Sequence, residues 1–495
     1  MEHLLGGFAS VLDPMNLMYC FIGVFLGTVI GILPGLGPLA TIAILLPMTY
    51  KMAVAPAIIM LSGIYYGVAY GGTATSVLLR IPGEASSVVT CLDGYMMARN
   101  GRAGAALGIA ALGSFVAGTV GTIAISYVSE PLAGIIFAFG PAEYTMLMLA
   151  GLSAVTYFSS TSLPRALLMA AFGLLLGCVG TDPMTLSPRL NFGSLELSAG
   201  IDLVALAVGL FGFSELLFMA RRKPESLAII SPPRDMRGYL PNRDELRRSA
   251  GPIGRGTVLG FLIGVLPGGG AVLASFLSYA VERKVSRHPE QFGKGAVEGL
   301  AGPETANNAG TAGAFLPLLC MGMPANAATA VLLSAFMIHG VSPGPTLIAR
   351  QPELFWAIIA SMYIGNVMLV VLNVPLIGLL IRVIEIPRAY LGSIILFLCV
   401  IGVYSGSGDA SGVVLAVLFG FIGYALRRGG YDLGVIVLAF VLGPILERSI
   451  RQALTISNGD ARVFVGSPLA IGIGLVAAAI LVAGLWPKRP VLVPE

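Results

Sequence analysis

Polar side chains gather at two places inside long apolar stretches of this sequence. The first group is Thr73, Thr75, Ser76, Glu84, Ser86 and Ser87, and the second is Glu304, Thr305, Asn307, Asn308 and Thr311. Polar groups are expensive inside a membrane segment, so each of them is by default a functional hypothesis. Hydroxyl, amide and carbonyl oxygens of this kind can coordinate a small cation such as Na⁺ where a helix is broken.

The second group has helical spacing. Pro303 suits a first helical turn, and Asn307 and Asn308 follow Glu304 at i+3 and i+4, on the same helix face. We predict that Glu304, Asn307 and Asn308 bind the coupling cation or proton of a transporter. The alternative is that Ser, Thr and Asn only tie helices together, worth about 1 kcal/mol or less each. We favour that alternative for isolated Ser and Thr residues, and function for the Asn pair.

A duplicated motif must position these residues. Residues 23–46 read GVFLGTVIGILPGLGPLATIAILL, and residues 256–277 read GTVLGFLIGVLPGGGAVLASFL. At a constant spacing of 233 residues, the glycines and proline of the first copy fall on those of the second, from Gly23 on Gly256 to Gly37 on Gly270. Glycines four residues apart let two membrane helices approach closely. The match therefore indicates an internal duplication.

Each copy of the motif contains a helix break. Proline removes an amide donor and glycine permits positive φ, so Leu-Pro-Gly-x-Gly interrupts the apolar run. The predicted hairpin tips are Pro34, Gly35 and Gly37 in the first copy and Pro267, Gly268, Gly269 and Gly270 in the second. Such a break is tolerated in a membrane only where it is buried in protein or lines a polar cavity. The helix N-termini after Gly37 and Gly270 would offer free amides to a carboxylate. A kinked helix that crosses the membrane fully is the alternative to a re-entrant hairpin.

A second interrupted unit follows each motif, over residues 63–94 and 302–334. The interruptions are Ile81-Pro82-Gly83 and Met323-Pro324-Ala325. Paired, broken segments in two halves of a chain point to a transporter binding site. We predict that Thr73, Thr75, Ser76, Ser86 and Asn326 line the substrate path.

Composition supports a membrane protein. The 495 residues are 56% apolar and 11% charged, against roughly 25% charged residues in soluble chains, and the mean hydropathy is +0.89. We predict an all-α polytopic membrane protein with about twelve membrane segments, each judged against the roughly 20 residues that a crossing needs. The five cysteines are scattered singly and indicate neither a disulfide framework nor a metal site.

The positive charges predict the topology. Of the 29 Lys and Arg residues, nine lie in 221–255 and four in 283–294, so both loops are expected in the cytoplasm. These loops flank the second motif, whereas the first motif has almost no positive charge around it, as expected if the two halves are inverted repeats. The predicted domains are a first membrane repeat over 1–220, a basic cytoplasmic loop over 221–254, and a second repeat with frame helices over 255–495. A connector with interspersed acidic residues gives no basic face for nucleic acid.

One rival chemistry is visible. Gly406-Ser407-Gly408-Asp409 and Tyr431-Asp432 resemble the aspartate motifs of intramembrane proteases, in which two carboxylates share a proton. Those enzymes have the two motifs in the opposite order, and both aspartates lie at predicted helix ends. We therefore predict that Asp409 and Asp432 are loop residues and that the chain is not an enzyme. A passive channel is the other rival.

With LPGLGPLATIAILLP, YYGVAYGGTATSVLLRIPGEASSVVTCLDGY, LPGGGAVLASFLSY and PETANNAG, the chain resembles the large membrane subunit (TctA family) of the tripartite tricarboxylate transporters over nearly its whole length. The resemblance implies a multi-pass secondary transporter of the bacterial inner membrane. Its implied partners are a small four-helix membrane subunit and a periplasmic solute-binding protein. The implied substrates are di- or tricarboxylates, imported with a Na⁺ or H⁺ gradient, with no cofactor apart from Na⁺ as a coupling ion.

Two positions depart from the family pattern. Arg80 stands where the family has an asparagine, and Ala325-Asn326 stand where it has a Gly-Ser pair. Both lie beside the expected site, so we do not assign citrate as the substrate. Arg80 would either add a charge for a carboxylate or pair with Glu84.

Overall fold

The computed structural model describes residues 2–33, 36–136, 139–159, 161–182, 184–221, 230–233, 235–380, 382–383, 386 and 388–485. Helices dominate this part of the chain. Its sheet is one antiparallel hairpin, in which β1 (Gly180–Thr181) pairs with β2 (Pro188–Arg189). The prediction of an all-α fold is confirmed.

The helices before the basic loop and within it are α1 (Glu2–Val11), α2 (Pro14–Gly31), α3 (Pro38–Leu45), η1 (Leu46–Thr49), α4 (Val54–Leu79), η2 (Ala85–Val88), α5 (Thr90–Met97), η3 (Ala98–Arg102), α6 (Ala103–Ile136), α7 (Pro141–Phe158), α8 (Leu163–Gly177), α9 (Leu195–Ser198), α10 (Leu203–Ala207), η4 (Val208–Phe213), α11 (Ser214–Arg221) and η5 (Met236–Tyr239).

The remaining helices, the first of which begins inside that loop, are α12 (Arg243–Val265), α13 (Gly270–Val285), η6 (Pro289–Gln291), α14 (Val297–Gly313), α15 (Phe315–Met321), α16 (Ala327–Ile338), α17 (Pro345–Arg350), α18 (Pro352–Asn373), α19 (Ile377–Leu380), α20 (Arg388–Ser407), α21 (Ala410–Arg428), α22 (Leu433–Ile456), η8 (Ala461–Val465) and α23 (Pro468–Leu485).

The glycine rows pack as the duplication predicts. A β-carbon added at Gly23 or Gly31 of α2 would meet the backbone oxygens of Met60 and Val68 in α4 at 2.2 and 2.5 Å. The same addition at Gly256 and Gly264 of α12 would meet the oxygens of Gly302 and Gly310 in α14 at 2.5 and 2.3 Å. The close contacts between α12 and α14 in the second half therefore repeat those between α2 and α4 in the first half. Only glycine permits backbones this close.

These contacts define a second spacing. From Met60 to Gly302 and from Val68 to Gly310 the distance along the chain is 242 residues. It exceeds the 233 residues between the two motifs because the connection from motif to broken unit is longer in the second half. The two halves therefore share one packing unit, α2 with α4 and α12 with α14.

The predicted breaks are present in both halves, but the motifs pack differently. Helices α12 and α13 lie against one another, whereas α3 packs mainly on α4, α16 and η4 and has few contacts with α2. The folded-back arrangement is therefore clearer in the second motif than in the first.

Eight helical segments of the described chain are long and apolar enough to cross a membrane. Four shorter apolar helices accompany them, at 38–49, 163–177, 327–338 and 468–484. The chain is a multi-pass membrane protein. The predicted count of twelve is not established, because the breaks divide apolar runs into pieces shorter than a full crossing.

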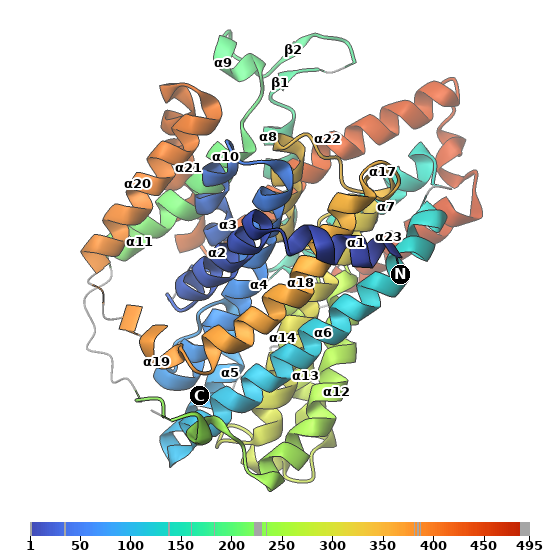
Figure 1. Ribbon diagram of the computed structural model, residues 1–495. Coiled ribbons are helices and arrows are strands. Elements are labelled where there is room, and N and C mark those ends of the chain that lie inside the picture. The colour runs from blue at the N-terminus through green and yellow to red at the C-terminus, as the bar shows by residue number, and fades with distance from the viewer. Residues whose placement is uncertain are drawn as a thin grey trace.

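Peripheral helices surround the two packing units (Figure 1). Helix α18 lies along α4 and α6, helices α7, α8, α22 and α23 pack together, and α11 and α20 pack on α21. Figure 1 places the β1–β2 hairpin at one end of the molecule and the start of α12, with the loop joining α13 and α14, at the other. At that second end Arg102 Nε donates to Glu245 Oε1 at 2.9 Å, which joins η3 to α12.

Candidate functional site

The two broken units have the same backbone design. Arg80 ends α4 in the left-handed region at φ 57°, and Gly322 ends α15 in that region at φ 67°. A proline follows two residues later in each case and prevents the helix from resuming at once. Arg80 and Gly322 are 242 residues apart, like the packing contacts, so the breaks are equivalent.

Equivalent residues restart the chain after each break. Glu84 begins η2, where Ser87 Oγ accepts from the Glu84 N–H at 3.3 Å, and Asn326 begins α16 in a reciprocal capping box with Thr329. The Asn326 amide oxygen accepts from the Thr329 backbone N–H at 3.0 Å. Such capping boxes satisfy amides that a helix start leaves free. Glu84 and Asn326 are both half-buried, which places a polar side chain at the mouth of each break.

Each half reaches into the break of the other half. Asn307 Nδ2 on α14 donates to Glu84 Oε1 at 3.2 Å, and Asn326 Nδ2 donates to the hydroxyl of Tyr65 on α4 at 2.8 Å. Tyr65 and Asn307 are again 242 residues apart. Reciprocal contacts between equivalent residues are what an approximate two-fold relation produces. The two breaks and the two long helices thus form one site.

The motif tips meet the same breaks. A β-carbon added at Gly37 would lie 3.9 Å from Glu84 Cβ, and one added at Gly270 would lie 3.9 Å from Asn326 Cβ. Gly268, at φ 76°, donates its N–H to Ala325 O at 2.7 Å. Because a β-carbon at Gly268 would meet Ala154 O at 2.7 Å, this tip requires glycine. Gly37 and Gly269 directly precede α3 and α13.

Of the predicted tip prolines, the structure describes Pro267 but not Pro34. Pro34 and Gly35 lie outside the described residues. Pro267 is half-buried and lies near Gly151 of α7, at 3.8 Å from a β-carbon added there.

Glu304 lies at the centre of the predicted cation group and is fully buried. Its carboxylate accepts hydrogen bonds from Thr73 Oγ1 at 2.6 Å and from the Thr90 hydroxyl. Among the described residues no ion pair reaches Glu304 or Glu84. A cavity of about 10 Å³ lined by Thr73 and Tyr70 has room for about one water molecule. The carboxylate is therefore held by neutral donors.

The two asparagines have different partners. Asn308 Nδ2 donates to Ser114 Oγ at 2.7 Å and to Glu304 O at 3.1 Å, which ties α14 to α6. The Asn307 Oδ1 atom is buried and accepts no hydrogen bond from any residue that the structure describes. An unpartnered buried acceptor is uncommon and calls for an explanation.

The remaining predicted polar residues make local contacts. Thr75 and Ser76 donate to Gly72 O within α4, at 3.0 and 2.9 Å, and Ser86 donates to the Glu84 carboxylate. Arg80 is exposed, and no ion pair joins it to Glu84. Thr73, Ser86, Asn307 and Asn326 are therefore in the cross-connected site, whereas Thr75 and Ser76 bond their own helix.

Sequence reasoning missed several members of this site. Tyr65, Thr90 and Ser114 resembled ordinary residues of apolar helices, and Glu84 was noted but given no role. The spacing of 242 residues is the signal that could have identified Tyr65, because it shows that Tyr65 in the first half is equivalent to Asn307 in the second. No comparable signal marks Thr90 or Ser114, which reach the site through long-range packing.

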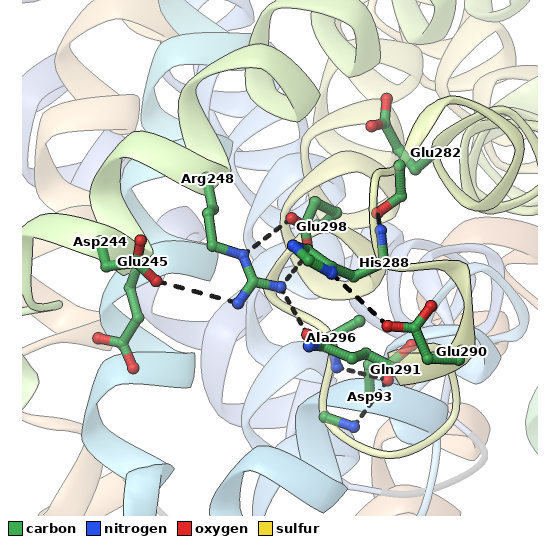
Figure 2. Close-up of polar contacts among 12 residues, drawn as sticks. Asp93, Asp244, Glu245, Arg248, Glu282, His288, Glu290, Gln291, Ala296 and Glu298 are labelled. Atoms are coloured by element: carbon green, nitrogen blue, oxygen red, sulfur yellow. Dashed lines mark hydrogen bonds and ion pairs between the residues drawn. The ribbon is translucent and has the colours of Figure 1, made fainter.

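A second polar cluster, the basal cluster, comprises Asp93, Glu245, Arg248, Gln291 and Glu298 (Figure 2). Arg248 Nε donates to Glu298 Oε1 at 2.9 Å, and its Nη2 donates to Gln291 Oε1 at 2.8 Å. Asp93 Oδ1 accepts the backbone N–H groups of Gly293, Gly295 and Ala296 at 2.8 to 2.9 Å. The carboxylate of α5, in the first half, thus holds the loop that leads into α14.

Charge pairing keeps Glu245 and Glu298 ionised. Burial opposes ionisation of Glu245 and Glu298, but the guanidinium groups of Arg102 and Arg248 hold the pKa of each carboxyl below its usual value. These ion pairs join α12 to η3, which directly precedes α6, and to α14. The basal cluster is an anchor between the halves.

The aspartates of the rival protease reading are far apart. Asp409 caps the start of α21, where its Oδ1 accepts from Ser411 N at 3.0 Å. Asp432 caps the start of α22 and lies beyond the other end of α21. A helix of 19 residues is roughly 28 Å long, so these carboxylates cannot share a proton.

Comparisons with known proteins identify the family of this chain. The model of the tripartite tricarboxylate transporter TctA family matches residues 17–438. An uncharacterized 52.8 kDa protein in the TAR-I ttuC' 3' region of Agrobacterium vitis is 48% identical over 482 residues, which cover 97% of this chain and 95% of that protein. An uncharacterized protein in the TAR-II ttuC' 3' region of the same organism is 49% identical over 234 residues, 46% of this chain and 97% of that protein. No solved structure matches the chain. The chain belongs to the tripartite tricarboxylate transporter TctA family.

Proposed function

We propose that this chain is the permease subunit of a binding-protein-dependent secondary transporter that imports di- or tricarboxylates across the bacterial inner membrane. The observation that carries the proposal is the reciprocal joining of the two broken units at Glu84, Asn307, Tyr65 and Asn326. Transporter sites lie where interrupted helices of two repeats meet. We further propose that the repeats are inverted, with the site near the membrane midplane.

Helix N-termini support an anionic substrate. Helix α3 starts beside the Glu84 break and α13 starts at the Asn326 break, where α16 also begins. Helix N-termini present free N–H groups and a partial positive charge to anions. In this proposal the substrate carboxylates bind along Pro34, Gly35, Gly37, Pro267 to Gly270, Thr73, Thr75, Ser76, Ser86 and Asn326.

Two carboxylates, the fully buried Glu304 and the half-buried Glu84, support cation coupling. Glu84 and Glu304 would repel an anionic substrate, and the ionised form of a buried carboxyl is costly without a counter-charge. Binding of Na⁺ or H⁺ near Glu304, Asn307 and Asn308 would neutralise the site before the substrate enters. The unpartnered Asn307 Oδ1 supplies an oxygen ligand for Na⁺. Substrate and cation would therefore bind together or not at all.

The partners in this proposal are a small four-helix membrane subunit and a periplasmic solute-binding protein. The binding protein would deliver the carboxylate to the open site. Movement of the broken units against the surrounding helices would then expose the site to the cytoplasm.

Uptake into vesicles tests the proposal. Vesicles holding this chain, its small subunit and its binding protein would receive radiolabelled di- and tricarboxylates under an imposed Na⁺ or pH gradient. We expect accumulation that follows one gradient and needs no ATP. Flux that only equilibrates the substrate would instead favour a channel, and no flux for any carboxylate would reject the substrate class.

A further inference from the structure

An apolar groove lies on the outside of the molecule, away from the candidate site. Helices α11, α20 and α21 form its walls, and its volume is about 530 Å³. Leu216 and Leu217 of α11, Leu396 of α20, and Val417 and Phe421 of α21 line it. The segments 203–221, 390–407 and 410–428 that carry these residues are all long and apolar enough to cross a membrane. The groove therefore faces the lipid region.

One end of the groove is cationic. Arg221 ends α11 and Arg428 ends α21, and both are exposed. Arg221 Nη1 donates to the hydroxyl of Tyr424 at 2.6 Å. Tyr424 follows the groove residue Phe421 by three positions and Arg221 follows Leu217 by four, so the cationic end continues the groove walls.

The ion pair of Arg427 and Glu215 beside this end does not cancel the positive charges of Arg221 and Arg428. Arg427 Nη1 bonds Glu215 Oε2 at 2.5 Å, and its guanidinium lies 4.7 Å from the centroid of the Phe218 ring. That pair is neutral overall, whereas Arg221 bonds a neutral hydroxyl. Because a guanidinium carries five N–H donors, Arg221 keeps donors for a further anion.

We propose that this groove binds one anionic phospholipid, with its phosphate at Arg221 and Arg428 and an acyl chain between α11, α20 and α21. Basic sites beside membrane helices select anionic head groups. A partner helix fits less well, because a helix about 10 Å across and 20 Å long occupies on the order of 1,500 Å³. The head group would lie at the end of the spans from which the basic loop departs.

Native mass spectrometry of the purified full chain tests the proposal, with phosphatidylglycerol and phosphatidylcholine of identical acyl chains as probes. We expect one phosphatidylglycerol to bind at least about tenfold more tightly than phosphatidylcholine. R221Q/R428Q should abolish that preference, because it removes both guanidinium groups that would hold the anionic head group. The control Arg462→Gln removes an exposed arginine of η8 and should keep the preference.

A second variant tests the acyl-chain part. A β-carbon at Gly392 in the groove would meet only Leu216 Cδ2, at 3.9 Å, so Gly392→Leu can enter the groove without a backbone clash. It should weaken both lipids while thermal unfolding stays as in the wild type. Equal binding of the two lipids by the wild type, or an unchanged preference in R221Q/R428Q, would overturn the proposal. So would displacement of the lipid when the small subunit joins the complex, because that would assign the groove to a protein partner.

Discussion

At the scale of single residues, Glu304 is the group whose charge should matter most. It is fully buried, its described partners are the hydroxyls of Thr73 and Thr90, and a second carboxylate, Glu84, belongs to the same site. Glutamine has nearly the same shape: its amide oxygen can accept from one hydroxyl and its amide N–H can donate to the other hydroxyl oxygen, but it cannot bind a proton or balance a cation. Replacement by glutamine therefore separates charge from packing.

Glu304→Gln should lower gradient-driven uptake by about tenfold or more, since a hydrogen bond to a charged group contributes about 1.5–3 kcal/mol. The amount of inserted protein should stay unchanged. Radiolabelled uptake measures the first quantity and immunoblotting of membranes the second. The matched control Glu353→Gln removes an exposed carboxylate at the start of α18 and should transport normally. Wild-type uptake by Glu304→Gln would remove Glu304 from the coupling role.

Arg80 allows backbone and charge to be tested separately. Its φ of 57° is unfavourable for a side chain, by roughly 1–2 kcal/mol, and the equivalent position holds Gly322. Arg80→Gly should raise the thermal unfolding temperature, and Arg80→Asn should raise it less because asparagine tolerates this region partly. If the exposed guanidinium serves the substrate, both variants lose uptake although they are more stable. Unchanged uptake in both would show that Arg80 is only the end of α4.

The residues of the site were predictable to different degrees. The breaks at Pro82 and Pro324 follow from local chain chemistry, because proline and its neighbours cannot continue a helix. Glu304 and the asparagines stand out as polar groups in apolar segments. Tyr65 was not recognised, because an aromatic residue in an apolar helix looks like core until its partner Asn326 is placed against it. Partners from distant segments depend on tertiary packing, which local patterns do not encode.

At the scale of elements, the α12–α14 contact depends on missing β-carbons. Alanine normally stabilises a helix by up to about 1 kcal/mol relative to glycine. At Gly264, however, the added β-carbon would lie 2.3 Å from Gly310 O, and overpacking costs typically about 1–3 kcal/mol. Gly264→Ala should therefore lower the apparent unfolding temperature in detergent.

Gly254 on the same helix supplies the control for that prediction. A β-carbon there would meet nothing within 4 Å, so Gly254→Ala should leave the unfolding temperature unchanged or raise it. A destabilisation of the same size in both variants would mean that α12 tolerates alanine poorly everywhere. The tight contact with α14 would then not be the cause.

The loop that carries β1 and β2 should be sensitive to acid. The backbone N–H groups of Met184 and Thr185 donate to the Asp182 carboxylate, and Arg451 pairs with it. Together these contacts outweigh the cost of desolvation and lower the pKa of Asp182 to about 2. A lowered pKa contributes stability above the unfolded value near 3.9, and that stability is lost as the pH falls toward about 2. The protection factors of the Met184 and Thr185 N–H groups in hydrogen exchange should therefore fall below about pH 4. Asp182→Asn should show fast exchange already at neutral pH, and slow exchange in that variant would contradict the assignment.

At the scale of the whole molecule, the two halves share packing, breaks and reciprocal contacts, but their orientation in the membrane is a separate question. The glycine motif predicted the duplication because it is repeated in the letters of the sequence. Inversion of the two halves was inferred only from the Lys and Arg residues of the loops. Such charges favour one orientation of a segment in the membrane but do not determine it. Exposed residues at equivalent ends of the two motifs can decide the orientation: Lys51 follows the first motif, and Arg287 follows the second.

Single cysteines at these positions should label from opposite sides if the repeats are inverted. Four of the five native cysteines are buried, so a Cys178→Ala background leaves little native labelling. A membrane-impermeant maleimide should modify Lys51→Cys in intact cells and Arg287→Cys only after the membrane is opened. Arg99→Cys is the control, because its segment lies at the same end of the molecule as the basal cluster and should behave like Arg287→Cys. If Lys51→Cys and Arg287→Cys label from one side, the halves are parallel. Alternating exposure would then need a motion other than the exchange of two inverted units, because parallel halves open toward the same side.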